Sequence, residues 1–258
     1  MIYVLAAAII AAASFLFAML GLGGGMVYVP ILHWMGFDLK TVAIPLGLLL
    51  NGLNTLLALW VYSRKGLVDW RGGAAMGIAA TVGAPLGAFV QPMVPKSYLL
   101  VFFAAAVVAA AARMLLTAFR SQDQLRELAA PATRLAVGVS GGAAIGFVGG
   151  MLGIGGGFLV GPILLALGYP AKKAAATTAL VVTFSSISGF AGYAAQGHFP
   201  LLATVLGVLA VLLGSTLGAR FMTGKAKSTW ITQTYAVVLV LIAVKLVWDA
   251  VAATGCCF

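Results

Sequence analysis

The stretch Gly21-Leu-Gly-Gly-Gly-Met-Val-Tyr-Val-Pro-Ile-Leu32 returns 132 residues later as Gly153-Ile-Gly-Gly-Gly-Phe-Leu-Val-Gly-Pro-Ile-Leu164. Both copies lie inside apolar runs long enough to form membrane helices. A helix that breaks in lipid frees backbone N–H and C=O groups, and these are tolerated only where they line a cavity or bind something. Two related halves, each broken by glycines, are typical of membrane proteins built from repeats.

Composition places the chain in a membrane. Hydrophobic residues make up 63% of it and charged residues 8%, with a mean hydropathy of +1.13, whereas soluble domains carry about 25% charged residues. We therefore expect an all-α polytopic membrane protein. The net charge of +10 would suggest nucleic acid in a soluble chain. Here the basic residues lie in short loops and at span ends, so we interpret them as topology signals and expect no nucleic acid partner.

Hydropathy divides the chain into eight apolar segments, at 1–36, 41–62, 73–94, 97–118, 135–169, 173–196, 200–222 and 230–253. The first and fifth are too long for one span, and each contains a glycine-rich break. The strongly polar stretch 119–134 is the predicted cytoplasmic linker between a first transmembrane repeat, 1–118, and a second, 135–258.

The repeat continues beyond the glycines. Gly36 and Lys40 match Gly168 and Lys172 at the same offset. Later, Gly83-Ala-Pro-Leu-Gly-Ala resembles Gly214-Ser-Thr-Leu-Gly-Ala at an offset of 131 residues, and both are small-residue patterns that let helices approach closely. Because order and spacing are kept together, we interpret the two halves as a duplication.

Basic residues distinguish two topologies. If every segment crossed once, with the N-terminus inside, 8 of the 15 basic residues would be cytoplasmic, which is no bias. If the first and fifth segments are hairpins that turn at the glycines, with the N-terminus outside, the cytoplasmic set is Arg64, Lys65, Arg71, Arg113, Arg120, Arg126, Arg134, Lys172, Lys173, Arg220, Lys225 and Lys227, or 12 of 15. The positive-inside rule favours the second topology. The fold predicted is two inverted repeats, each with a Gly-rich broken or re-entrant helix hairpin.

A hairpin that turns in mid-membrane aims helix N-termini, with their partial positive charge and free N–H donors, at the centre. Neutral amides and hydroxyls nearby would complete a site for an oxyanion. The candidate substrate-binding residues are Gly23, Gly24, Gly25, Asn51, Asn54, Gly155, Gly156, Gly157, Thr177, Thr178, Thr183 and Ser186. The alternative is that the glycines serve helix packing and the hydroxyls bond their own helix. That alternative is weaker for the asparagines, because an unpartnered amide is costly in lipid.

Chemistry beyond binding is not indicated. His33 and His198 belong to no metal or catalytic motif, no carboxylate lies centrally in a segment, and we expect no catalytic residue, metal or cofactor. Asp69-Trp70-Arg71 is predicted to be an interfacial anchor with a local ion pair.

The chain resembles the TauE/SafE sulfite exporter family. The resemblance lies in the two glycine-rich copies and in the stretches Gly66-Leu-Val-Asp-Trp-Arg71, Ala175-Ala-Thr-Thr-Ala-Leu180 and Gly214-Ser-Thr-Leu-Gly-Ala-Arg220. The resemblance implies a bacterial inner-membrane permease that exports sulfite, organosulfonates or related small anions. It departs from the pattern where the first half has Pro45-Leu46 in place of Thr177-Thr178.

We accordingly expect a secondary transporter that works by alternating access, with a small anion and the bilayer as partners. Efflux of an anion from a negative interior is electrically downhill. The alternatives are an anion channel, an uptake permease for a sulfur compound and, least favoured, a membrane enzyme. A homodimer is left open.

Overall fold

The computed structural model describes residues 2–95, 108, 130–193 and 199–224, and beyond them only a few scattered positions between 227 and 244. The expected segments 97–118 and 230–253 therefore lie outside the described residues, apart from those isolated positions. Most of the expected linker lies outside them too, but its last residues, from Pro131 to Arg134, form the first turn of a helix.

The described chain is helical throughout. Its α-helices are α1 (Ile2–Leu20), α2 (Gly25–Trp34), α3 (Ile44–Arg64), α4 (Trp70–Val90), α6 (Pro131–Leu152), α7 (Gly157–Ala166), α8 (Ala171–Tyr193) and α9 (Leu201–Gly224), with a π-helical turn at Leu39–Ala43 and a 3₁₀ turn at Gln91–Met93. Six helices of this described part are long and apolar enough to cross a membrane. In contrast, α2 and α7 have 10 residues each, about 15 Å of helix and half the hydrocarbon thickness.

Glycines separate the long helix α1 from the short helix α2, and the long helix α6 from the short helix α7. Between α1 and α2, Gly21 and Gly23 have φ of 68° and 69°; between α6 and α7, Gly153, Gly155 and Gly156 have φ of 77°, 69° and 75°. This left-handed region is readily accessible only to glycine. The sequence prediction that the first and fifth segments break at their glycines is confirmed.

Polar residues define the starts of the long helices. Asp38 accepts hydrogen bonds from the backbone N–H groups of Lys40 and Thr41 at the π-helical turn before α3. Asp69 caps α4 by accepting from the N–H of Gly72. These caps satisfy backbone donors that a helix start leaves free.

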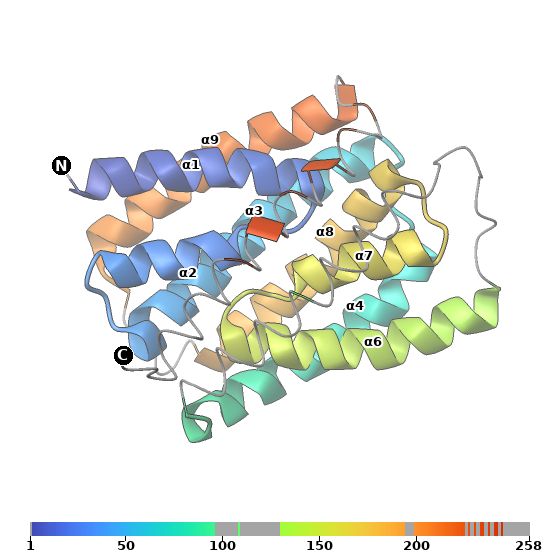
Figure 1. Ribbon diagram of the computed structural model, residues 1–258, viewed down its shortest axis with the longest axis horizontal. Helices are drawn as coiled ribbons and strands as arrows, with labels where there is room; N and C mark the ends of the chain where they lie inside the picture. The colour runs from blue at the N-terminus through green and yellow to red at the C-terminus, as the bar shows by residue number, and fades with distance from the viewer. Residues whose placement is uncertain are drawn as a thin grey trace.

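Small residues bring α4 against α6 and α1 against α9. A Cβ added to Gly142, Gly146 or Gly150 of α6 would overlap the backbone of α4, and one added to Gly214 or Gly218 of α9 would overlap the backbone of α1. Figure 1 shows α1 and α9 along one edge, α6 and α4 along the other, and α3 and α8 between them. The spacing of small residues therefore fixes the two outer helix pairs.

The order in which residues of one helix meet residues of another shows whether the two helices run in the same direction. Gly142, Gly146 and Gly150 meet Met76, Ala80 and Ala84 in turn, so α4 and α6 run in the same direction. By the same test α1 is parallel to α9, and α4 is parallel to α8. The central helices α3 and α8 run in opposite directions, because Asn51 meets Ser186 while the earlier Leu48 meets the later Gly189.

These directions gather basic residues at one end of the bundle, which we call the basic end. The starts of α4, α6 and α8 meet there, since Asp69 contacts both Arg134 and Thr177. The α3–α4 turn and the end of α9 lie at the same end. The described basic residues placed there are Arg64, Lys65, Arg71, Arg134, Lys172, Lys173 and Arg220. Lys40, at the start of α3, lies at the opposite end.

Enlarging Gly146 should separate α4 from α6. A valine there would press on the Ala80 backbone, and we expect Gly146→Val to lower the stability of the purified protein by about 1–3 kcal/mol, as overpacking does. The matched control is Gly141→Val, since a Cβ at Gly141 meets only the tip of Ile163, 4.0 Å away. Thermal unfolding in detergent measures both, and equal melting temperatures would contradict this account of the packing.

Candidate functional site

The two glycine-rich breaks meet at the centre of the bundle. A Cβ on Gly25, at the start of α2, would lie 2.9 Å from the Cα of Ile154 in the other break. A Cβ on Gly157, at the start of α7, would overlap the carbonyl oxygen of Leu22. The absence of side chains therefore lets two backbone segments, far apart in sequence, touch each other.

The side chain of Asn51 holds the two breaks together. It lies on α3 and is fully buried. Its Oδ1 accepts a hydrogen bond from the N–H of Gly25 at 2.7 Å, and its Nδ2 donates to the carbonyl of Ile154 at 3.1 Å and to Ser186 Oγ at 2.7 Å. One amide thus satisfies a free donor of the first break and a free acceptor of the second, and ties both to α8.

Other side chains donate hydrogen bonds to carbonyls near the helix ends and in the second break. Tyr62 of α3 donates to the carbonyl of Ala18 in α1, and Tyr193 of α8 donates to that of Gly150 in α6 at 3.2 Å. Ser185 donates to the carbonyl of Gly155 at 2.6 Å. These residues were not among the predicted site residues, although Tyr62 and Tyr193 are related by the repeat offset of 131 that marks other matches.

Several predicted site residues come together around Asn51. A Cβ on Gly23 would overlap its Oδ1, and one on Gly155 would overlap Ser186 Oγ. The other glycines of the predicted set, Gly24 and Gly156, pack against the ring of Tyr28 and against Ile145. In this conformation the space at each of these positions is taken by protein atoms.

The predicted threonines separate into different environments. Thr183, the repeat counterpart of Asn51, donates to the carbonyl of Ala179 in its own helix at 2.6 Å. Thr177 accepts from the backbone N–H of Asp69 at 3.1 Å, at the basic end. Thr178 is fully buried, and its hydroxyl has no hydrogen-bond partner.

Asn54 differs from Asn51 although both are completely buried on α3. Neither Oδ1 nor Nδ2 of Asn54 has a hydrogen-bond partner. Its backbone carbonyl is engaged, accepting from Ser215 of α9 at 2.7 Å. A buried amide without partners costs free energy, so the unused capacity of Asn54 is the conspicuous chemical feature of the core.

The predicted local ion pair of Asp69 with Arg71 is wrong. Within the described residues, Asp69 pairs with Arg134 of α6, at 3.7 Å, and accepts a hydrogen bond from the hydroxyl of Tyr169 at 2.7 Å. Burial alone would raise the pKa of the Asp69 carboxyl, but the N–H of Gly72, the hydroxyl of Tyr169 and the charge of Arg134 outweigh it and hold the pKa below its ordinary value. No sequence pattern indicated a partner 65 positions away.

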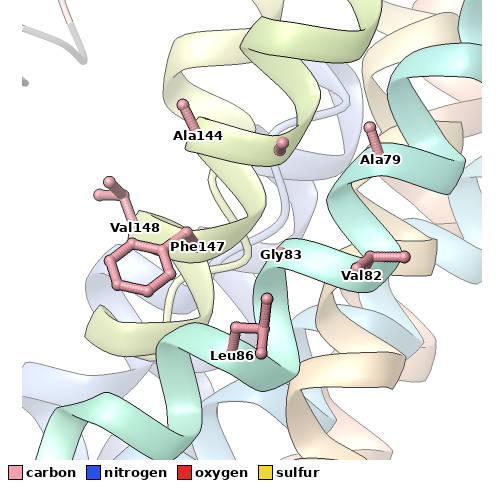
Figure 2. A pocket seen from close by; sticks show the side chains of 8 residues that line it. Ala79, Val82, Gly83, Leu86, Ala144, Phe147 and Val148 are labelled. Atoms are coloured by element: carbon pink, nitrogen blue, oxygen red, sulfur yellow. The ribbon is translucent and has the colours of Figure 1, made fainter.

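An apolar groove of about 580 Å³ lies between α4 and α6 and is distinct from these polar groups (Figure 2). It is lined by Ala79, Val82, Gly83, Leu86, Ala143, Ala144, Phe147 and Val148. Val82 and Leu86 are more than half exposed. Because no polar side chain lines this groove, it offers nothing to an anion.

The described part of the chain contains no group of three or more His, Cys, Asp or Glu side chains able to hold a metal. What the core offers is neutral: amides, hydroxyls and the backbone of the two breaks. Such an arrangement can bind a solute through hydrogen bonds.

Six described helices able to span a membrane, two broken helices and a neutral polar core are typical of a multi-pass membrane transporter. The chain belongs to the Sulfite exporter TauE/SafE family, whose pattern it matches over residues 5–246. It is thus a membrane transporter and not an enzyme.

Relatives agree with this membership. The chain is 27% identical to the Probable membrane transporter protein YunE of Bacillus subtilis, over 91% of this chain and 93% of the relative. It is also 27% identical to the Probable membrane transporter protein y4hK of Sinorhizobium fredii, over 90% and 93%. A shorter match, 45% identical over 22% of this chain and 12% of the relative, is to Sulfite exporter TauE/SafE family protein 3 of Arabidopsis thaliana. No solved structure matches the chain.

Removing the Asn51 amide should loosen the contact between the breaks. Asn51→Ala leaves the N–H of Gly25 and the carbonyl of Ile154 without their partner, and we expect a loss of about 1–3 kcal/mol for each group left unsatisfied. Thr183→Ala is the control, because the hydroxyl of Thr183 serves only its own helix. Thermal unfolding of the two purified variants tests this, and an Asn51→Ala protein no less stable than Thr183→Ala would refute it.

Proposed function

We propose that this protein is a secondary transporter that exports a small sulfur oxyanion, sulfite or an organosulfonate, across the bacterial inner membrane by alternating access. Family membership supports the substrate class. The core supports an anion bound without a fixed countercharge, since its polar groups are amides, hydroxyls and backbone. Asp38 and Asp69 lie at the ends of described spans, where they serve as helix caps.

The observation that carries the proposal is the buried amide of Asn54. Both of its polar atoms lie in the core without a hydrogen bond. A polar side chain inside the membrane costs free energy, and such residues are typical of substrate sites. The Nδ2 donor suits a sulfur oxyanion. Thr178, buried with an unused hydroxyl, is a second donor of the same kind. We assign substrate recognition to these two residues and to the glycine breaks, Gly23–Gly25 and Gly155–Gly157, which move apart when the site opens.

Inverted repeats are part of the proposal. Corresponding helices of the two halves run in opposite directions. Helix α3 runs opposite to α8, which it contacts. Helix α3 is parallel to α9, because Leu50 meets Gly207 and Asn54 meets Ser215, so α1, which is parallel to α9, runs opposite to α6. The contacts between the halves are also equivalent: α1 of the first half packs on α9 of the second, and α6 of the second half packs on α4 of the first. The shortness of α2 and α7 supports re-entrant hairpins that return to the side they came from.

The direction of transport follows from charge. Placing the basic end in the cytoplasm obeys the positive-inside rule. With that interior negative, export of an anion releases about 2.3 kcal/mol per elementary charge for each 100 mV of membrane potential. Export then needs no coupled ion, which agrees with spans whose described acidic residues lie at helix ends.

Flux measurements test the substrate and the mechanism together. In proteoliposomes held at a set membrane potential, we expect saturable sulfite and sulfonate movement towards the positive side. Flux that rises linearly without saturation would favour an anion channel. Uptake against the potential would favour a permease with a coupled ion. No flux of any sulfur oxyanion would remove the proposed substrate class.

Asn54→Leu should separate recognition from stability. Leucine has the same number and branching of side-chain heavy atoms as asparagine and leaves no polar atom unsatisfied, so we expect the melting temperature to stay equal or rise. Sulfite flux should fall by about tenfold, corresponding to the loss of one good hydrogen bond to an anion. The control is Thr55→Val, whose lost hydroxyl bonds only carbonyls of its own helix. An Asn54→Leu protein with normal KM and maximal flux would exclude Asn54 from the site.

A further inference from the structure

Four polar residues form one connected cluster at the basic end. The carboxylate of Asp69 accepts from Tyr169 and lies 3.7 Å from Arg134, which also donates to Tyr169 at 3.4 Å. The backbone N–H of Asp69 donates to Thr177. The cluster therefore links the start of α4, in the first half, to α6, the turn after α7, and α8, all in the second half.

The opposite end has no such cluster in the described residues. The repeat places Phe37 at the position of Tyr169 and Pro45 at that of Thr177. Asp38 caps a helix there as Asp69 does, but its bonds are to Lys40 and Thr41 and stay within three residues. Only at the basic end, within the described chain, does a capping carboxylate join the two halves.

The strength of the cluster suits a contact that opens and closes. Charge-assisted hydrogen bonds hold the halves together. The side chains of Arg134 and Asp69 are each 26% exposed, so water can form hydrogen bonds to them when the contact opens. A fully buried pair would resist separation much more. Beneath the cluster, next to Thr177, lies the buried and unpartnered Thr178.

We propose that Asp69, Arg134, Tyr169 and Thr177 form a latch that closes the basic end of the transport path. With the latch engaged, α4 is tied to α6 and α8, and Thr178 is sealed from that side. Opening requires the Asp69 carboxylate to leave Arg134 and Tyr169, which frees the halves to separate there. The latch rests on the proposed alternating access but does not depend on which anion is carried.

Accessibility of a single cysteine tests the latch. Thr178→Cys is made in a Cys256→Ser, Cys257→Ser background, which changes the buried hydroxyl for a thiol of similar size. A membrane-impermeant thiol reagent is then supplied separately to the basic end and to the opposite end, using vesicles of the two orientations. No transported substrate is present, so failure of the sulfite proposal leaves this measurement intact.

We expect slow labelling from the basic end with the latch intact. Asp69→Asn and Tyr169→Phe should each raise that labelling rate by about tenfold. This corresponds to a loss of about 1.4 kcal/mol in the free energy that favours the closed state. The matched control is Asp38→Asn, the same substitution at a helix cap that joins no other half, and it should leave the rate unchanged. Arg134→Lys keeps the charge and should restore much of the protection that Arg134→Gln loses.

The side of labelling distinguishes opening from unfolding. A latch variant should react faster from the basic end alone. Equal rates in the intact and latch variants would overturn the proposal. A rise from both ends, or the same rise in Asp38→Asn, would also overturn it, because it would show general loosening of the protein rather than release of one gate.

Discussion

Hydrocarbon offers no partner to a backbone N–H or C=O group, and both halves of this protein break a helix inside the bundle. The remaining structure answers that constraint. Asn51 satisfies one group from each break, Tyr62 and Tyr193 satisfy helix-end carbonyls, and Ser185 satisfies a carbonyl of the second break. The glycines make this possible, since without side chains the two breaks approach closely enough to share one amide.

The two halves meet this constraint unequally. Asn51 bridges both breaks, whereas its repeat counterpart Thr183 bonds only its own helix. Asp69 joins the halves at the basic end, whereas Asp38 at the other end forms only local bonds. The two halves have helices in the same order, and unequal polar contacts between them favour one arrangement over the other. In a transporter such bias sets which side is closed at rest.

In the export of an anion that we propose, the neutral core determines how the substrate is held. A fixed positive charge beside the site would bind the substrate in every state and slow its release. Amide and hydroxyl donors bind through geometry, so a small movement of the breaks changes affinity strongly. Asn54 and Asn51 illustrate the division: one amide is fully used in holding the fold, and the other retains its whole hydrogen-bonding capacity.

The sequence by itself determined the membrane class and the positions of the helix breaks, because hydropathy and the need for glycine at positive φ are local properties. It also identified Asn51 and Asn54 as unusual in lipid. Only the tertiary structure decided that they differ, that Thr177 belongs to the basic end, and that Asp69 pairs with Arg134. Those outcomes depend on which helices are neighbours and in which direction they run, and a linear sequence does not specify either.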